Sequence, residues 1–194
     1  MKKIFVFVLM TLLLTVAAVS AQTAVEEVAV SAQTAGEELE ISWEDIAPMA
    51  KEIDPDGAFY LVGETGLKMW IPAIFIEEEL TEEDIDDGMV LFLSTADGSA
   101  YVAVNHVDLE GGTLEDGYAG LLLDDQYSDV EMGKINGLKV LSYTNVENDM
   151  TGLSFIDSDG YMIQFLFYPQ SDEGFSAVAA IMGASIQTGE SQDK

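Results

Sequence analysis

The chain has 194 residues, among them 36 Asp and Glu, seven Lys and no Arg, and its formal net charge is −29. A protein this acidic and without arginine has nothing with which to neutralise phosphates, which argues against nucleic acid and anionic membranes as partners. The sequence also lacks cysteine, so an apolar core, and not disulfides, must hold the fold.

Residues 1–21 have the three zones of a secretory signal. Lys2 and Lys3 form a positive start, residues 4–16 (IFVFVLMTLLLTV) are mainly apolar, and a small-residue tract ends in Val-Ser-Ala at Ala21. The apolar run is shorter than the roughly 20 residues that span a bilayer, which favours a cleaved signal over a membrane anchor. We therefore predict cleavage after Ala21.

A near-perfect duplication follows the signal. Residues 18–28 (AVSAQTAVEEV) and 29–39 (AVSAQTAGEEL) match closely, and the second copy offers an alternative cleavage site after Ala32. Two copies are too few for a repeat fold. We interpret residues 22–43 as a flexible lead-in to a domain of residues 44–187, with residues 188–194 as a disordered tail.

Cleavage would make the product more acidic, because five lysines would then face all 36 carboxylates. There is no cysteine to carry a lipid, and no apolar stretch follows Ile186. We therefore expect a secreted or extracytoplasmic protein that is soluble, is not lipid-anchored and has no membrane span after cleavage.

The first predicted helix covers Asp45–Ile53. Asp45 would be its N-cap, which would put Pro48 at the third helical position, where the missing N–H of proline costs nothing. The apolar residues of this segment then share one face of the helix: Ile46, Met49, Ala50 and Ile53.

Four β-hairpins are predicted after this helix. Asn136-Gly137 is the strongest turn signal, because a type I′ turn needs a positive φ at both central residues. The predicted strand pairs are 58–62 with 67–71, 89–95 with 100–107, 131–135 with 138–145, and 153–157 with 161–168.

Three more helices are predicted. A short one lies within Glu77–Asp87 with Thr81 as its cap, a second runs from Thr113 to about Gln126, and the last covers Glu173–Ser185. The apolar stripe of the second helix is Leu114, Tyr118, Leu121 and Leu122, and that of the last is Phe175, Val178, Met182 and Ile186. This order predicts an α+β fold, a largely antiparallel sheet with helices on both faces in an α/β/α sandwich.

Four phrases of the sequence resemble the PsbP/DcrB-like superfamily of small extracytoplasmic domains. They are GLKMWIP at residues 66–72, INGLKV at 135–140, YMIQFLFYP at 161–169 and IMGASI at 181–186, and the resemblance covers about residues 58–187. The superfamily includes a subunit of the photosynthetic water-oxidising complex, a nuclear-import factor that binds a GTPase, and bacterial envelope proteins. The resemblance implies a non-enzymatic interaction role and supplies no catalytic motif.

Two acidic turns are the candidate cation sites. Asp157-Ser158-Asp159-Gly160 and Asp54-Pro55-Asp56-Gly57 both begin like a calcium loop, but neither has a glutamate at the twelfth position. We interpret both as turns and keep a low-affinity cation binder as an alternative function.

The residues of the chain point to no enzyme. His106, the only histidine, shares a strand face with Val102 and Val104, so we interpret it as structural. One histidine and no cysteine cannot build a zinc or iron site, and no G-x-S-x-G motif is present. We therefore assign no catalytic residue, metal or cofactor.

The first hypothesis is a non-enzymatic domain that binds a protein or envelope component. A carboxylate-only hydrolase of the glycosidase type is the other alternative, because abundant acids form pairs by chance. Trp70 and Tyr143 lie opposite apolar strand faces, and we expect a covering layer of helix to bury them.

Overall fold

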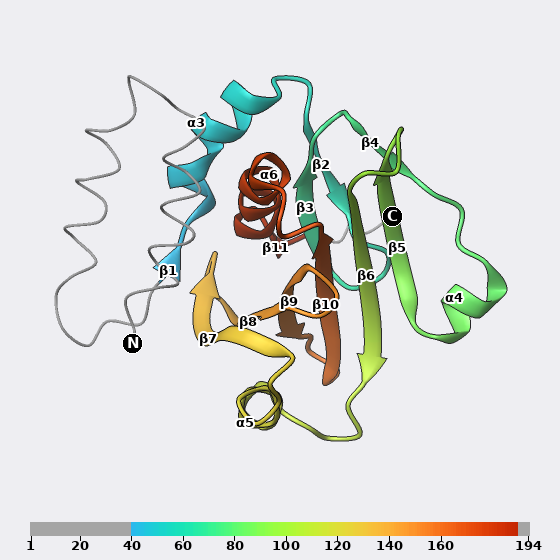
Figure 1. The fold of residues 1–194 in the computed structure, drawn as a ribbon, viewed down its shortest axis with the longest axis vertical. Coiled ribbons are helices and arrows are strands. Elements are labelled where there is room, and N and C mark those ends of the chain that lie inside the picture. Colours follow the sequence, from blue (N-terminus) through green and yellow to red (C-terminus); the bar gives the residue numbers. More distant parts are fainter. Residues whose placement is uncertain (1–39, 190–194) are drawn as a thin grey trace, which may run out of the picture.

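The structure, a computed structural model, describes residues 40–189, which form two β-sheets and four helices (Figure 1). The large sheet contains β1 (Glu40–Ile41), β4 (Phe75–Glu77), β5 (Met89–Thr95), β6 (Tyr101–Asp108), β7 (Tyr127–Ile135), β8 (Leu138–Asn145), β9 (Met150–Ile156) and β10 (Tyr161–Tyr168). The small sheet contains β2 (Ala58–Leu61), β3 (Leu67–Ile71) and β11 (Gln187–Thr188). The helices are α3 (Trp43–Ile53), α4 (Glu82–Asp86), α5 (Leu114–Leu121) and α6 (Glu173–Ala184).

The strand order of the large sheet is β1-β7-β8-β9-β10-β6-β5-β4, and only the β1–β7 pair is parallel. Three of the predicted hairpins form it, and β10 joins the later pairs to β6. The first predicted hairpin, β2–β3, instead pairs with β11 in the small sheet. Local patterns show that two strands form a hairpin, but not which sheet the hairpin joins.

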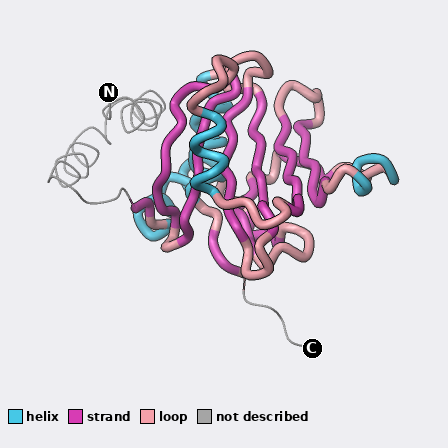
Figure 2. The backbone as a smooth tube through the Cα atoms, turned by 90° about the horizontal axis from the view of Figure 1, so that it is seen from below, coloured by secondary structure: helices cyan, strands magenta, loops and turns pink. Residues whose placement is uncertain are grey.

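Helices cover both faces of the large sheet. On one face, α3, α6 and the small sheet enclose the main core, while α5 packs on the other face against β7, β8 and β9. In Figure 2 the helix α5 crosses one half of the sheet, and the only helix near the opposite edge is α4. The predicted α+β fold, with a largely antiparallel sheet and helices on both faces, is confirmed.

The first helix begins at Trp43, two residues earlier than predicted. Ser42 is its N-cap and accepts a hydrogen bond from the Glu44 backbone N–H at 3.3 Å, so Asp45 lies inside the first turn. Pro48 is therefore inside the helix and not at its third position, and it cannot donate to the carbonyl one turn before it. The predicted apolar face is correct, with Ile46 and Ala50 buried.

The middle helix is shorter than predicted. Thr113 caps it as expected, with its side chain accepting from the Asp116 backbone N–H, but α5 ends at Leu121 and not near Gln126. Leu122 lies beyond the helix and is exposed, so it does not belong to the apolar stripe. Two glycines inside α5 lower its helix propensity, which favours an early end.

The other two helices agree closely with their predictions. Thr81 caps α4, and α6 covers all but the last residue of its predicted range. The predicted stripe of α6 packs into the core, and further residues of the helix are buried as well because α6 lies between α3 and the large sheet. They include Ala177, Ala179, Ile181 and Ala184.

The strand predictions for β3, β5, β8 and β10 have the correct bounds, whereas β7 and β9 begin earlier than predicted. A bulge between Ser128 and Glu131 breaks the alternation of β7, which hides its first half in the sequence. β1, β4 and β11 were not predicted, because two or three residues carry no periodic pattern. Trp70 and Tyr143 are both 4% exposed, as expected.

The described residues begin within the expected lead-in and end within the expected tail. The signal and both cleavage sites, Ala21 and Ala32, lie outside the described residues. At the end of the expected lead-in, Glu40 and Ile41 form β1 and Trp43 starts α3, and Thr188 at the start of the expected tail belongs to β11.

Candidate functional site

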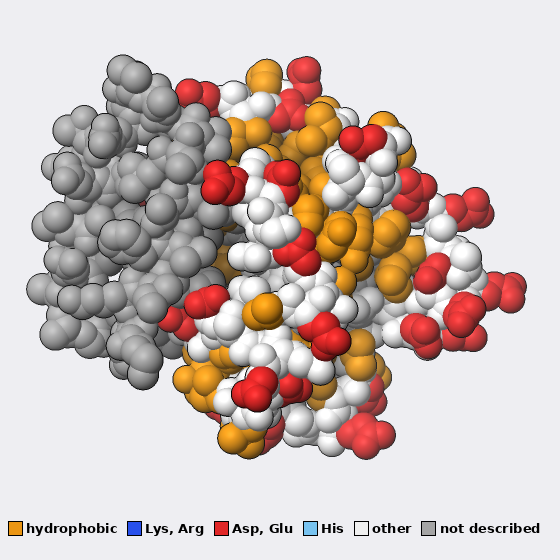
Figure 3. Space-filling view, in the orientation of Figure 1, with side chains coloured by type: hydrophobic (Ala, Val, Ile, Leu, Met, Phe, Trp, Pro, Cys, Tyr) orange, Lys and Arg blue, Asp and Glu red, His pale blue; other side chains and the backbone are white. Residues whose placement is uncertain are grey.

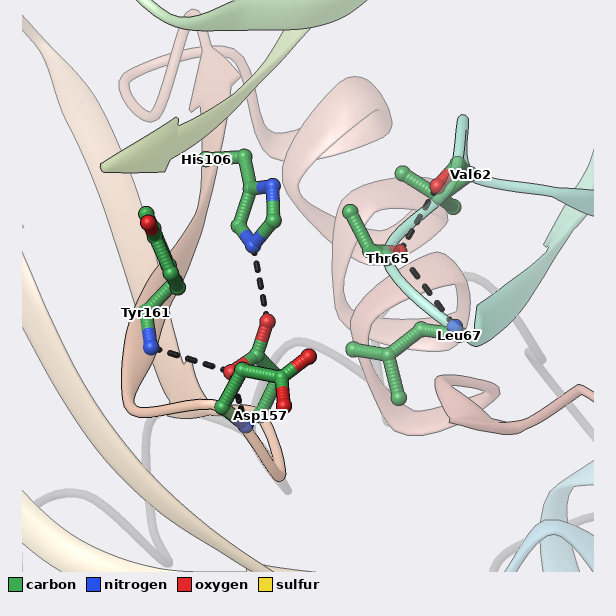
Figure 4. Close-up of polar contacts among 7 residues, drawn as sticks. Val62, Thr65, Leu67, His106, Asp157 and Tyr161 are labelled. Carbon is green, nitrogen blue, oxygen red and sulfur yellow. Dashed lines mark hydrogen bonds and ion pairs between the residues drawn. The ribbon is translucent and has the colours of Figure 1, made fainter. Parts of the chain in front are cut away.

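The histidine is paired with one of the candidate cation-binding aspartates. His106 extends from β6 toward the β9–β10 turn, where its Nε2 lies 2.8 Å from Oδ2 of Asp157 (Figure 4). The other oxygen, Oδ1, accepts hydrogen bonds from the backbone N–H groups of Asp159 and Tyr161, each at 2.9 Å. Both carboxylate oxygens of Asp157 therefore hold the turn and the neighbouring strand together.

This environment favours the ionised carboxylate. Burial alone would raise the pKa of Asp157, but hydrogen bonds from His106, Tyr161 and Asp159 outweigh burial and lower the pKa below its ordinary value. The Tyr161 ring also lies against the imidazole, with centroids 5.1 Å apart. The geometry agrees with a structural histidine and with a turn.

Asp54 has a similar structural role at another turn. Its Oδ1 accepts from the backbone N–H of Asp56 at 2.9 Å, and its Oδ2 accepts from the backbone N–H of Ala73 at 2.6 Å. The carboxylate thus ties the turn after α3 to the segment between β3 and β4. Within residues 40–189, no group of three or more His, Cys, Asp or Glu side chains is arranged to hold a metal ion.

A cleft of about 520 Å³ lies beside the His106–Asp157 pair. The β2–β3 turn, the start of α5 and the β9–β10 turn form its walls, and its acidic side chains are Glu64, Glu115, Asp157 and Asp159. Glu115 is paired with Lys139, which lowers its pKa, and the pKa of Asp157 is lowered too. A glycosidase needs one carboxylic acid with a raised pKa. Neither shift in this cleft has that direction.

Within the described residues, His106 is not hydrogen-bonded to any hydroxyl of the cleft. Figure 4 shows Thr65 across from the His106–Asp157 pair. Its hydroxyl donates to the Val62 carbonyl at 2.7 Å and accepts from the Leu67 backbone N–H at 3.3 Å, so both of its roles are used within the β2–β3 turn. In the described part of the chain, the only hydrogen-bond partner of the His106 ring is Asp157.

A smaller apolar groove of about 120 Å³ runs between α6 and strands β7, β8 and β9. Burial and the nearby Asp129 raise the pKa of Glu131, which lies on its wall. The serine hydroxyls of the groove donate to backbone carbonyls, Ser142 to Glu131 and Ser176 to Gln170. One carboxyl with a raised pKa does not by itself form a reaction centre.

The second face of the large sheet is covered over only half of its width. In β8, residues of both faces are buried, because α6 lies on one side and α5 on the other. In β10, Ile163, Phe165 and Phe167 are at most 1% exposed, but the residues between them are half-buried. One face of β10 is therefore sealed, and the other is partly open.

We call this half the open face. Cross-strand register assigns its residues, because directly opposed residues project to the same side. Figure 3 shows hydrophobic side chains gathered where Figure 1 places β5 and β6, with carboxylates around them. The open face consists of Ile76, Glu78, Phe92, Ser94, Tyr101, Tyr168 and the buried Ala103. Leu166 lies at its border, where it packs against the smaller core cluster beneath α5.

Three aromatic rings form a row on the open face. Tyr101 and Tyr168 are opposed in register and stack with centroids 4.7 Å apart, and Phe92 lies 5.4 Å from Tyr101. Burial, and to a lesser extent Tyr168, raise the pKa of Tyr101. We call Phe92, Tyr101 and Tyr168 the aromatic row.

The aromatic row was not predicted from the sequence. Each residue stood at an alternating position of a predicted strand, but Tyr101 and Tyr168 become neighbours only through the β6–β10 pairing. That pairing joins strands of different hairpins. The sequence did contain one signal, namely aromatic residues on the side of the predicted strands that faces away from the apolar side. That signal indicates an aromatic surface only when the order of the strands in the sheet is known.

Searches with family models and among curated proteins return no match. A comparison with solved structures finds a cyanobacterial PsbP (CyanoP) from Synechocystis sp. PCC 6803, with 14% identity over 69% of this chain and 92% of that chain and a TM-score of 0.49. It also finds a crystal structure from Bacteroides thetaiotaomicron VPI-5482, with 15% identity over 71% of this chain and a TM-score of 0.43.

The first of these structures is of the PsbP type, the family that the sequence phrases resemble. The match to the second spans 50% of that chain. At identities of 14% and 15%, the likeness to both structures is one of fold alone. Separately, no helix within the described residues is long and apolar enough to cross a membrane.

Proposed function

We propose that this protein is a non-enzymatic interaction domain that works outside the cytoplasm and binds a protein or envelope component through the open face. The aromatic row is the observation on which the proposal rests. Partly exposed apolar side chains gathered on one face, with a polar rim, are typical of interaction sites in soluble proteins. Residue types that favour interfaces, above all tyrosine, occupy the centre of this face.

The rest of the site geometry is consistent with this proposal. The candidate carboxylates Asp54 and Asp157 are engaged in turns, which gives the cation-binding alternative no support. In the cleft, the pKa values of Glu115 and Asp157 are lowered and not raised, which gives the glycosidase alternative no support. The extracytoplasmic location is supported by the signal-like residues 1–21.

The interaction is tested by cross-linking in the native cell. A photoreactive phenylalanine analogue replaces Tyr101 in the full chain, and the matched control carries it at Tyr60, which is 54% exposed on the small sheet. We expect one defined adduct, identified by mass spectrometry, from position 101 and not from position 60. No adduct, or the same adducts from both positions, would contradict the proposal.

The location is tested separately by N-terminal sequencing of the exported protein. We expect the mature chain to begin at Gln22 or Gln33, according to which small-residue site is cleaved. An exported or cell-associated protein that keeps Met1 would rule out the cleaved signal and leave the interaction role to be judged by cross-linking.

A further inference from the structure

We propose that the partner of the open face is a basic polypeptide segment, whose lysine or arginine side chains lie on the aromatic row and reach the carboxylates at its rim. This inference deepens the proposed function and rests on it. It depends on the distribution of apolar rings and carboxylates over the face.

The centre of the open face is apolar and its border is anionic. Glu78 accepts a hydrogen bond from the Ser94 hydroxyl at 2.5 Å, and the Glu78 backbone N–H donates to the Phe92 carbonyl. These contacts hold the exposed Glu78 carboxylate beside the aromatic row. The Glu78 carboxylate is thus held next to the rings of Phe92 and Tyr101.

The β5–β6 turn, which leads into Tyr101, carries a second carboxylate that is held by its neighbours. Asp97 accepts hydrogen bonds from the Ser99 backbone and hydroxyl and from the Thr95 hydroxyl, which together lower its pKa to about 2. It therefore stays ionised at any physiological pH. Both carboxylates are held in place by neighbouring groups before a partner arrives.

Lysine and arginine side chains match this arrangement. Each has a long apolar stem and a cationic end, so the stem can cover ring edges while the end reaches a carboxylate. A cation near an exposed ring face is attracted by the ring as well. The lysines of the described residues are at positions 51, 68, 134 and 139, and none of them is a residue of the open face.

Other occupants fit less well. A second copy of this chain would bring a net charge of −29 against −29, and its own rim carboxylates would meet those of the first. A neutral partner would remove water from Glu78 without supplying a counter-charge, which disfavours binding. An anionic surface would be repelled outright.

The test measures binding of a defined basic probe to the purified mature protein. A labelled twelve-residue peptide of alternating lysine and leucine is titrated by fluorescence anisotropy, and a peptide with glutamate in place of lysine is the matched control. We expect saturable binding of the basic peptide alone, weakened about tenfold or more between 50 mM and 500 mM salt because the charges are exposed.

Variants locate the binding surface. Replacing both tyrosines, Tyr101→Leu with Tyr168→Leu, keeps apolar strand residues but removes the rings, and we expect about tenfold weaker binding. Glu78→Gln should weaken it about threefold. The matched controls are Tyr60→Leu on the small sheet and Glu52→Gln on α3, both exposed, which should change binding less than twofold.

A measurement on the wild-type protein locates the binding surface even if the double variant does not fold. Amide chemical shifts are mapped with the basic peptide, and we expect the changes to concentrate on β4, β5, β6 and the end of β10. The inference is overturned if the basic peptide does not bind, if the shifts map elsewhere, or if the control variants weaken binding as much as the open-face variants. If the native partner cross-linked at position 101 is not basic, this inference is contradicted but the proposed function is still supported.

Discussion

The ring of Tyr143 occupies the space that a side chain at Gly152 would need. The two residues are directly opposed on β8 and β9, and a Cβ atom built on Gly152 would lie 2.1 Å from Cζ of Tyr143. Tyr143 is 4% exposed and belongs to the smaller core cluster beneath α5. The glycine is therefore required by the cross-strand packing of one aromatic ring, and no turn is involved.

This contact predicts a strong effect of Gly152→Ala. The added methyl group would displace a ring held on all sides, and overpacking of this kind lowers the free energy of unfolding by about 1–3 kcal/mol. Urea unfolding measures the change. The control is Gly120→Ala in α5, where a Cβ atom meets nothing within 4 Å, and it should stabilise the protein by up to about 1 kcal/mol. Equal effects of the two substitutions would refute the packing account.

Tyr143 should be the last tyrosine of the described residues to ionise. Burial raises its pKa to about 12, although hydrogen bonds from Ser154 and Gln164 act in the opposite direction. The neutral phenol is thus favoured in the folded state, and its stabilising contribution is present below about pH 10, the unfolded value, and lost as pH rises toward 12. An absorbance titration should show a late step that Tyr143→Phe abolishes and Tyr60→Phe leaves in place.

Asn136 connects a hairpin turn to two helices. Its Oδ1 accepts from the Trp43 backbone N–H at 2.5 Å, and its Nδ2 donates to the carbonyls of Ala184 and Ile186 at 3.0 and 2.8 Å. Asn136→Gly keeps the positive φ of the turn but removes three hydrogen bonds, so we expect a loss of about 2–3 kcal/mol in unfolding free energy.

The matched control for this substitution is Glu110→Gly. Glu110 has a φ of 51°, close to the 50° of Asn136, and it is an exposed residue of a turn. Its hydrogen bond to Asp108 comes from the backbone N–H, which glycine retains. We expect this variant to stay within about 0.5 kcal/mol of the wild type. A comparable loss in both variants would assign the effect to glycine itself.

The Asp157 carboxylate should contribute stability that depends on pH. Because its folded pKa is below the unfolded value, this contribution is complete above about pH 4 and is lost as pH falls through the folded pKa. Asp157→Asn should cost about 1–2 kcal/mol at pH 7, and the difference from wild type should shrink below pH 3. Urea unfolding at both pH values tests this, with Asp159→Asn, an exposed turn residue, as the control. A difference that is the same at both values would show that ionisation plays no part.

Several features could be predicted from the sequence because their causes are local. The turn at Asn136-Gly137 has positive φ at both residues, as predicted from the two residue types alone. The capping of α4 by Thr81 and of α5 by Thr113 depends on residues within one turn of the helix. The burial of Phe165 and Phe167 follows from alternation along a single strand.

Other features depend on residues that meet only in the folded chain. The position of β2–β3 in a separate sheet depends on pairing with β11, more than a hundred residues later. Asn136 also links two helices, which requires that the start of α3 and the end of α6 lie next to the same turn. No pattern within either segment contains that information.

The sequence by itself determined the acidity, the α+β class, most strand and helix positions, and the absence of a recognisable catalytic motif. These depend on composition and on short-range periodicity, which a chain displays before it folds. Only the tertiary structure decided which half of the sheet stays open, because α5 packs over β7, β8 and β9 and stops there. The aromatic row exists for the same reason, since strand order brings Phe92, Tyr101 and Tyr168 together on the half that α5 does not reach.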